Sequence, residues 1–188
     1  MSSERGRVIV ISGPTASGKS TLWRHLVSFP QVTFSVSATT RQMRDDEVDG
    51  RDYRFVDAAE FSAMADRGEF LEWAEVHGHC YGTLRSDVVA AVDSGKDILL
   101  EIDVQGAAQL GDTDLPVVSI FVSPPSLDEL RQRLVARGTE SVEEMDMRMS
   151  IVKQEMCYAD EYDYVVVNDE LERMIAEVES ILGLEVAS

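Results

Sequence analysis

One segment near the start of the chain combines the residue types and the spacing of a phosphate-binding loop. Residues 13–20 read Gly-Pro-Thr-Ala-Ser-Gly-Lys-Ser, which matches G-x-x-x-x-G-K-[ST] at every defined position. The glycines let consecutive backbone amides curl around a phosphate, and Lys19 can then reach the β and γ phosphates of a nucleotide. The hydroxyl of Ser20 is the expected Mg²⁺ ligand. The loop predicts binding of a nucleoside triphosphate with Mg²⁺ by Gly13, Pro14, Thr15, Ala16, Ser17, Gly18, Lys19, Ser20 and Thr21.

The elements on either side of the loop are those that such a loop requires. Residues 7–12 form a β-branched run typical of a strand, and residues 19–27 have helical character. Residues 38–54 are expected to be irregular, and residues 78–82 to form a turn. Because strands alternate with helices, the sequence predicts an α/β fold with a parallel sheet flanked by helices. The remaining expected strands are 32–37, 70–76, 97–103, 117–122 and 164–168, and the remaining helices are 57–66, 84–94, 171–182 and two that begin with capping boxes at Ser126 and Ser141.

The composition limits the partners of the chain. It has 188 residues, of which 44% are hydrophobic, and a formal net charge of −18. This suits one compact domain with a real core, and the negative charge argues against a nucleic acid as the main partner. No stretch is apolar enough for a membrane span, residues 1–7 hold no secretory signal, and two cysteines are too few for a disulfide framework. We therefore expect a cytoplasmic protein without a membrane partner, and whether it forms a homo-oligomer stays open.

Three further segments make the prediction specific. Residues 35–53 read Ser-Val-Ser-Ala-Thr-Thr-Arg-Gln-Met-Arg-Asp-Asp-Glu-Val-Asp-Gly-Arg-Asp-Tyr, and residues 69–83 and 100–106 add Glu-Phe-Leu-Glu-Trp-Ala-Glu-Val-His-Gly-His-Cys-Tyr-Gly-Thr and Leu-Glu-Ile-Asp-Val-Gln-Gly. Together they closely resemble the guanylate kinase family, and Val-Val-Val-Asn-Asp at 165–169 extends the resemblance to nearly the whole chain. The resemblance implies ATP with Mg²⁺ as phosphoryl donor and GMP as acceptor.

The resemblance also implies how the chain is divided. A single domain over residues 1–188 would have the P-loop NTPase-type parallel sheet flanked by helices, an inserted mixed α/β GMP-binding lobe and a helical lid. The expected bounds are about 1–36, 84–137 and 150–188 for the core, about 37–83 for the GMP-binding lobe and about 138–149 for the lid.

The residue chemistry fits GMP as the acceptor. Arg41 and Arg44 are three residues apart and suit a bidentate hold on one phosphate, with a third hydrogen bond from Tyr53. Guanine presents two adjacent donors, N1–H and the 2-amino group, and the carboxylate of Glu72 has two acceptor oxygens for them. Adenine lacks both donors, so AMP would leave that carboxylate unpaired. The remaining expected contacts to the base are the hydroxyls of Ser37 and Thr83 and the side chain of Tyr81.

Two acids and a set of arginines complete the expected site. Glu101 and Asp103 are two residues apart at the end of a strand, so they are expected to face the same side, toward the bound nucleotides. Asp103 would hold the Mg²⁺ hydration shell or orient the acceptor. In the resembled family, lid arginines come down onto the phosphates, and Gly138 is a plausible hinge. They correspond here to Arg133, Arg137 and Arg148, and Arg137 is also expected to cover the adenine with Asn168 nearby.

The chain departs from the usual family pattern at a few positions, and two other functions stay open. Thr15-Ala16 stands where Ser-Gly is common, Met43 and Asp46 replace a proline and a glycine, and Cys80 replaces a tyrosine. One alternative is a guanylate-kinase-like module that binds proteins and has lost catalysis. The other is a related kinase for a ribose phosphate, which should lack the base-reading residues.

Overall fold

The computed structural model describes residues 5–76, 78–136 and 142–184. The chain divides into two compact units. The first unit comprises Met1–Val10 and Pro30–Val118, and the second comprises Ile11–Phe29 and Ser119–Ser188. The phosphate loop belongs to the second unit, whereas the residues predicted to bind GMP belong to the first.

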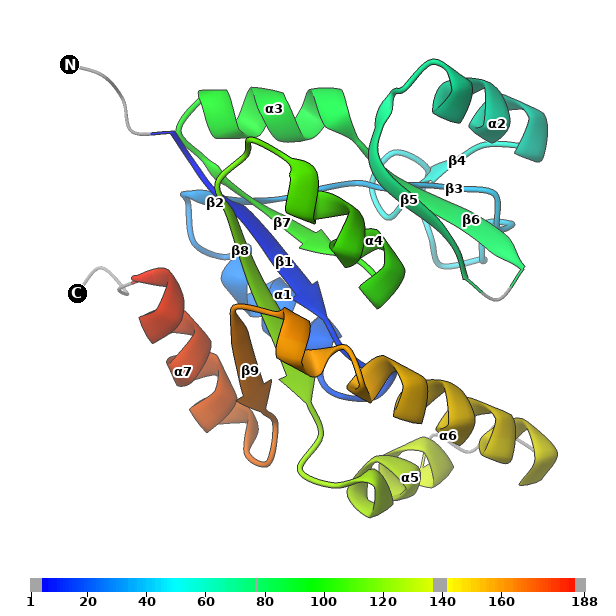
Figure 1. Ribbon diagram of the computed structural model, residues 1–188, viewed down its shortest axis with the longest axis vertical. Helices are drawn as coiled ribbons and strands as arrows, with labels where there is room; N and C mark the ends of the chain where they lie inside the picture. Colours follow the sequence, from blue (N-terminus) through cyan, green and yellow to red (C-terminus); the bar gives the residue numbers. More distant parts are fainter. Residues whose placement is uncertain (1–4, 77, 137–141, 185–188) are drawn as a thin grey trace. The chain divides into compact units, whose positions relative to one another are not determined.

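A five-stranded sheet carries the order β2-β7-β1-β8-β9 (Figure 1). Its strands are β1 (Val8–Ser12), β2 (Val32–Phe34), β7 (Asp97–Glu101), β8 (Val117–Ser123) and β9 (Tyr164–Val167). The pairs β2·β7 and β8·β9 are parallel. Every residue of β1 is buried, because parallel strands covered on both faces require continuous apolar runs. The predicted parallel α/β sheet is confirmed.

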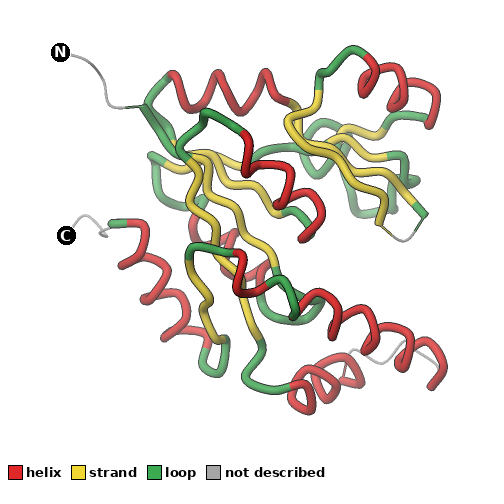
Figure 2. Tube along the Cα trace, in the orientation of Figure 1, coloured by secondary structure: helices red, strands yellow, loops and turns green. Residues whose placement is uncertain are grey.

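A separate four-stranded sheet belongs to the first unit, in the order β4-β3-β6-β5. It is mixed, because β3 (Ala38–Thr39) pairs parallel with β4 (Arg54–Phe55) and antiparallel with β6 (His79–Leu84). Figure 2 shows β6 and β5 (Phe70–Val76) side by side as an antiparallel hairpin. The predicted mixed α/β character of this region is therefore present.

The helix α2 (Ala58–Asp66) packs on this mixed sheet. It begins as predicted at Asp57, whose carboxylate accepts the backbone amide of Glu60 at 2.8 Å. Phe61 stacks on Phe70 with ring centroids 4.5 Å apart. Full burial of a side chain of this size contributes roughly 1.5–3 kcal/mol. The small core formed here consists of Ala38, Phe61, Met64, Phe70 and Leu84.

Two helices of the first unit lead into and out of β7. The helix α3 (Arg85–Asp93) follows β6 directly, and α4 (Val104–Ala108) follows β7 and continues into the 3₁₀ turn η1 (Gln109–Asp112). Asp103 begins α4 as its N-cap, because its Oδ1 accepts the backbone amide of Gly106 at 2.8 Å.

The second unit contains four helices among its described residues. These are α1 (Lys19–Leu26), α5 (Leu127–Ala136), α6 (Val142–Met156) and α7 (Leu171–Leu182), with the 3₁₀ turn η2 (Ala159–Glu161) before β9. The helix α7 lies along β9 and contacts α1, while α5 and α6 pack together (Figure 1). The capping bond predicted at Ser126 is present, since its hydroxyl accepts the amide of Glu129 at 3.1 Å. The capping box predicted at Ser141 lies outside the described residues.

Three expectations about local structure are wrong. Residues 78–82 are not all turn, because β6 begins at His79 and pairs with β5 up to Leu84. The segment 38–54 is not wholly irregular, because it contains β3 and the start of β4. Strand β7 ends at Glu101 and not at Asp103, because Asp103 is the N-cap of α4, which begins at Val104. No helix among the described residues has the length and apolar character to cross a membrane.

Candidate functional site

The phosphate loop joins β1 to α1 with two glycines that no other residue could replace without distortion. Gly13 has φ 140°, and a β-carbon added to it would lie 2.3 Å from the carbonyl oxygen of Val122. Gly18 has φ 105° and caps the start of α1. Both positions are disfavoured for residues with a side chain, and Gly13 also lets the loop approach the backbone of β8. The loop has the strand–loop–helix context that the motif requires.

Lys19 lies across the loop. Its Nζ donates to the carbonyl oxygens of Gly13 at 2.6 Å and of Pro14 at 2.9 Å. These bonds hold the ammonium group over the backbone that is predicted to bind phosphates. Ser20 lies beside Lys19 at the start of α1 and is exposed, so its hydroxyl is accessible to a phosphate-bound Mg²⁺. Mg²⁺ retains several water ligands, so one protein oxygen together with phosphates fits its chemistry.

Ala16 adopts an unusual backbone conformation inside the loop. Its φ is 61°, and within residues 5–76, 78–136 and 142–184 it is the one residue other than glycine that has a positive φ. This is the position at which the sequence departs from the glycine common in the family. Its side chain packs against the cluster of Leu130, Leu134, Met145 and Val152 formed by α5 and α6.

On the acceptor side, Arg41 is held by a residue that the sequence reasoning missed. Glu47 accepts Nη1 of Arg41 at 3.0 Å and Nη2 at 2.6 Å, and it also accepts the backbone amide of Arg44 at 2.8 Å. The hydrogen bond with Glu47 raises the pKa of Arg41, and the same bond lowers the pKa of Glu47. The guanidinium carbon of Arg41 lies 5.4 Å from the centroid of the Tyr53 ring. Glu47 therefore fixes Arg41 beside Tyr53.

Tyr53 and Tyr81 lie together, as expected for residues of one pocket. Their ring centroids are 5.9 Å apart with an edge-to-face geometry. Burial raises the pKa of Tyr53, and the negative charge of Glu101 adds to this effect. Tyr53, Tyr81 and Arg41 are thus brought together, and Ser37, which is half-buried, lies next to Ala38 on β3. The side chain of Arg44 is exposed.

Glu72 is a buried carboxylate on β5. It is 4% exposed, and its Oε1 accepts the backbone amide of Thr83 on β6 at 3.1 Å. Burial raises the pKa of Glu72 to about 7, with Thr83 lowering it and the charge of Asp103 raising it further. The hydroxyl of Thr83 is itself buried and lies near enough to Glu72 to help lower its pKa, but it makes no hydrogen bond of good geometry within the described residues. A buried carboxylate and an unpaired buried hydroxyl therefore stand side by side.

Asp103 has a different position from the one predicted. It lies outside the strand, because β7 ends at Glu101 and Asp103 is the N-cap of α4. Its Oδ2 accepts Nε2 of Gln105 at 3.2 Å. Both acids are half-buried. Within the described residues, no three His, Cys, Asp or Glu side chains group closely enough to hold a metal ion by themselves.

The structure describes some of the arginines predicted to contact the phosphates from the lid. Arg133 on α5 donates from Nη2 to the carbonyl oxygen of Asn168 at 3.0 Å, and its Nε lies 3.4 Å from Oε1 of Glu129. Arg148 is exposed on α6. Asn168 is buried, and its Nδ2 donates to the carbonyl oxygen of Ser17 at 2.7 Å. Arg137 and the hinge position Gly138 lie outside the described residues.

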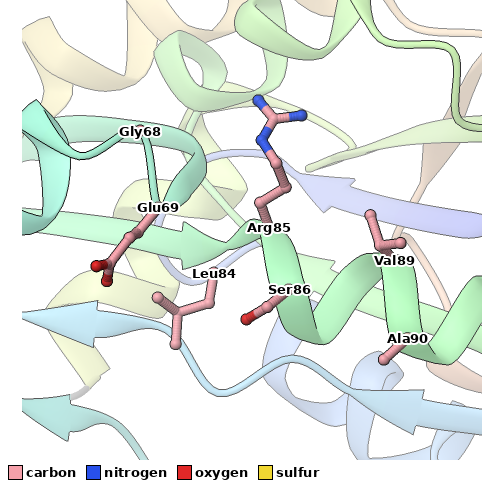
Figure 3. Close-up of a pocket in the computed structure, with 7 residues that line it drawn as sticks. All are labelled: Gly68, Glu69, Leu84, Arg85, Ser86, Val89 and Ala90. Atoms are coloured by element: carbon pink, nitrogen blue, oxygen red, sulfur yellow. The ribbon is translucent and has the colours of Figure 1, made fainter.

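A surface hollow of about 620 Å³ also lies in the first unit. Figure 3 shows that the side chains of Glu69 and Arg85 point away from each other there, so polar groups do not converge on it. No residue predicted for the site lines it. Its lining is Gly68, Glu69, Leu84, Arg85, Ser86, Val89 and Ala90.

Known proteins resemble this chain over nearly its whole length. The profile of the family described as guanylate kinase matches residues 5–185. A guanylate kinase of Thermotoga maritima is 45% identical over 182 residues, which cover 96% of this chain and 88% of the relative. One of Desulfitobacterium hafniense is 47% identical over 186 residues, or 98% and 93% of the two chains.

A solved structure agrees with these relatives. The guanylate kinase from Anaplasma phagocytophilum has a TM-score of 0.79 to this structure at 36% identity, covering 96% of this chain and 86% of that chain. Because both the profile match and these similarities extend along almost the entire sequence, the chain belongs to the guanylate kinase family.

Proposed function

We propose that this chain transfers the γ-phosphoryl group of ATP to GMP, giving ADP and GDP. The observation that carries the proposal is the buried pair of Glu72 and Thr83. A buried carboxylate costs free energy unless hydrogen bonds satisfy it, and buried hydroxyls are nearly always paired. Guanine would supply both needs, since its N1–H and 2-amino group donate to the carboxylate and its acceptors suit the hydroxyl. Ser37 and Tyr81 would complete the contacts to the base.

The same pocket would reject adenine. AMP offers no pair of donors at the matching edge, so its binding would leave Glu72 desolvated and unpaired. Unpaired polar groups in a site built for hydrogen bonds discriminate strongly, on the order of several kcal/mol. The phosphate of GMP would be bound by Arg41, Arg44 and Tyr53, with Glu47 holding Arg41 in place.

The transfer step itself requires alignment and charge neutralisation. An oxygen of the GMP phosphate attacks the γ-phosphorus in line, and the bond from that phosphorus to the bridging oxygen breaks, so that ADP leaves with the electron pair. Backbone amides of residues 13–20 and Lys19 would hold the donor phosphates. Mg²⁺, when bound through Ser20 and the phosphates, supplies positive charge to the β and γ oxygens. Glu101 and Asp103 would orient the acceptor and the hydration shell of the ion.

Arginines of the expected lid would offset charge on the moving group. Arg133 and Arg148 would serve this role together with Arg137. We assign the GMP-binding lobe to about 37–83, the lid to about 138–149 and the core to the rest of residues 1–188. We place the reaction in the cytoplasm, where ATP is abundant and where the thiols of Cys80 and Cys157, both unpaired here, stay reduced.

Two other functions fit less well. A protein-binding module without catalysis has no need for Lys19 held across an intact phosphate loop. A kinase for a ribose phosphate has no need for a buried carboxylate beside an unpaired hydroxyl.

The test is an assay of ADP release from ATP·Mg²⁺ with GMP, AMP, UMP and CMP in parallel. We expect release that depends on GMP, with the other acceptors near background. Folded protein that binds GMP but releases no ADP would contradict the proposal and favour the binding module.

A further inference from the structure

Asn168 is a buried polar residue whose side chain reaches the phosphate loop from a distant part of the sequence. It follows β9, and its backbone amide donates to the carbonyl oxygen of Ser123 on β8 at 2.8 Å. Only 7% of the residue is exposed. Its Nδ2 donates to the carbonyl oxygen of Ser17 at 2.7 Å. The backbone of Asn168 is thus fixed by the sheet, and its side chain is fixed by the loop.

The fit between Asn168 and the loop leaves no room for a side chain at Gly18. A β-carbon added to Gly18 would lie 2.1 Å from Nδ2 and 3.3 Å from Cγ of Asn168. Gly18 therefore meets two requirements, the positive φ of the cap and the close approach of Asn168.

The hydrogen bond to Ser17 determines the orientation of a whole peptide group. In a planar trans peptide, the carbonyl oxygen of one residue and the N–H of the next point in opposite directions. When Asn168 binds the oxygen of Ser17, the N–H of Gly18 must point away from Asn168. Phosphate-binding loops depend on amides that are oriented before the ligand arrives, because no reorganisation is then needed.

The same residue also binds the helix α5. Its backbone carbonyl oxygen accepts a hydrogen bond from Nη2 of Arg133 at 3.0 Å. Asn168 therefore links the phosphate loop to α5. Its side chain bonds the loop, and its carbonyl oxygen bonds Arg133 on the helix. Both contacts lie within the second unit.

We propose that Asn168 is a positioning residue that orients the Ser17–Gly18 peptide of the phosphate loop. It acts on donor phosphates of any nucleotide, irrespective of the base. This inference rests on the proposed function for its link to turnover, but its contribution to phosphate binding can be measured without an acceptor. It differs from a contact of Asn168 with the adenine, which would depend on the base.

The test compares binding of ATP·Mg²⁺ and of inorganic tripolyphosphate with Mg²⁺ by calorimetry. The variants are Asn168→Ala, which removes the amide, and Asn168→Asp, which puts a carboxylate oxygen against the oxygen of Ser17. Gln31→Glu is the matched control, because it makes the same amide-to-carboxylate change at an exposed position in the first unit. Thermal unfolding checks each variant, and Asn168→Ala carries the test if the buried charge of Asn168→Asp prevents folding.

We expect each Asn168 variant to weaken the binding of ATP and of tripolyphosphate by a similar factor. The loss of affinity should be about tenfold for Asn168→Ala and larger for Asn168→Asp. The KM for GMP should stay within about twofold, and Gln31→Glu should match the unmodified chain. Weaker binding of ATP with unchanged binding of tripolyphosphate would overturn the proposal in favour of an adenine contact. Unchanged binding of both ligands would overturn it as well.

The two proposals fail separately. Absence of GMP-dependent ADP release from the unmodified chain would overturn the proposed function. A parallel loss of ATP and tripolyphosphate binding in Asn168→Ala would still support the positioning role.

Discussion

Gly106 and Glu72 are packed so closely that a β-carbon added to Gly106 would lie 2.1 Å from Oε2 of the carboxylate. The amide of the same glycine donates to Oδ1 of Asp103. The first turn of α4 therefore limits where the buried carboxylate can lie. Because Thr83 holds Oε1 and Gly106 abuts Oε2, Glu72 has little freedom to move away from the base that it is proposed to bind.

Gly106→Ala should impair GMP recognition selectively. The added methyl must displace Glu72 or α4, so we expect the KM for GMP to rise about 10- to 100-fold, corresponding to roughly 1.4–2.8 kcal/mol. The KM for ATP should change less than twofold. Gly111→Ala is the control, since a β-carbon at Gly111 meets no other atom within 4 Å. Steady-state kinetics with each substrate varied will distinguish the two, and equal KM values for GMP in both variants would contradict the account.

Glu72 should make GMP binding depend on pH. Its pKa lies at about 7 in the folded chain, well above its ordinary value of 4.5. The carboxylate is the form that we propose accepts the guanine donors. Below pH 7 binding must therefore release a proton, and the apparent affinity for GMP should rise about tenfold per pH unit up to about 7 and level off above 8.

The same pKa shift should make the chain less stable as pH rises, whereas GMP binding should become tighter. Because the folded pKa of Glu72 is raised, the folded state favours the protonated carboxyl, and the free energy of unfolding should fall as pH rises from about 4.5 through 7.

Titration of the GMP phosphate also affects the pH dependence of GMP binding, so Glu72→Gln serves as the reference that retains only that contribution. A pH profile for GMP binding that is the same in Glu72→Gln would show that another group titrates.

Glu47 should influence the acceptor phosphate through Arg41. Glu47→Gln replaces a bidentate carboxylate with a neutral amide, so Arg41 loses its alignment beside Tyr53. We expect the KM for GMP to rise about 3- to 10-fold with kcat within about twofold. Arg51→Gln removes an exposed ion pair with Asp52 in the same segment and should have no comparable effect. A lower KM in Glu47→Gln would mean instead that Glu47 competes with the phosphate for Arg41.

Replacing Ala16 with glycine should lower the free energy of unfolding less than replacing an alanine inside a helix. Its left-handed backbone costs about 1–2 kcal/mol, whereas a change to glycine loses roughly 0.4–1 kcal/mol through the unfolded chain and up to about 0.8 kcal/mol of methyl burial. These effects nearly cancel, so Ala16→Gly should change the free energy of unfolding by less than about 0.5 kcal/mol. Ala63→Gly, inside α2, should destabilise by about 0.5–1 kcal/mol. Urea denaturation measures both, and equal losses would contradict the strain assigned to Ala16.

The sequence was sufficient for features that depend on local patterns. The phosphate loop and the cap at Asp57 were predicted because each rests on residues close together in the chain. The parallel sheet was predicted because strands alternate with helices along the whole sequence. The contact of Glu47 with Arg41 was not predicted, because it depends on the backbone path of one irregular segment. The contacts of Gly106 with Glu72 and of Asn168 with Ser17 were not predicted either, because they join segments far apart in the chain. Nothing in the residues around Asn168 indicates that Ser17 lies 2.7 Å away.

The error over residues 78–82 has a definite physical cause. Both glycines of this segment favoured a turn, but only Gly78 has a positive φ. Gly82 is a strand residue, and a β-carbon there would lie 2.7 Å from the ring of Phe70, so it is glycine to admit an aromatic neighbour. The strand length of β7 was likewise overestimated, because the cap at Asp103 depends on the fold of the helix after it.

The most direct test of the account is the ratio of kcat/KM for GMP to that for AMP, in the unmodified chain and in Glu72→Gln. Replacing the carboxylate with an amide puts an N–H donor against the donors of guanine and gives adenine a partner that it can pair with. We predict a large ratio in favour of GMP for the unmodified chain and a ratio at least about 100-fold smaller for Glu72→Gln. An unchanged ratio would contradict the claim that Glu72 reads the base.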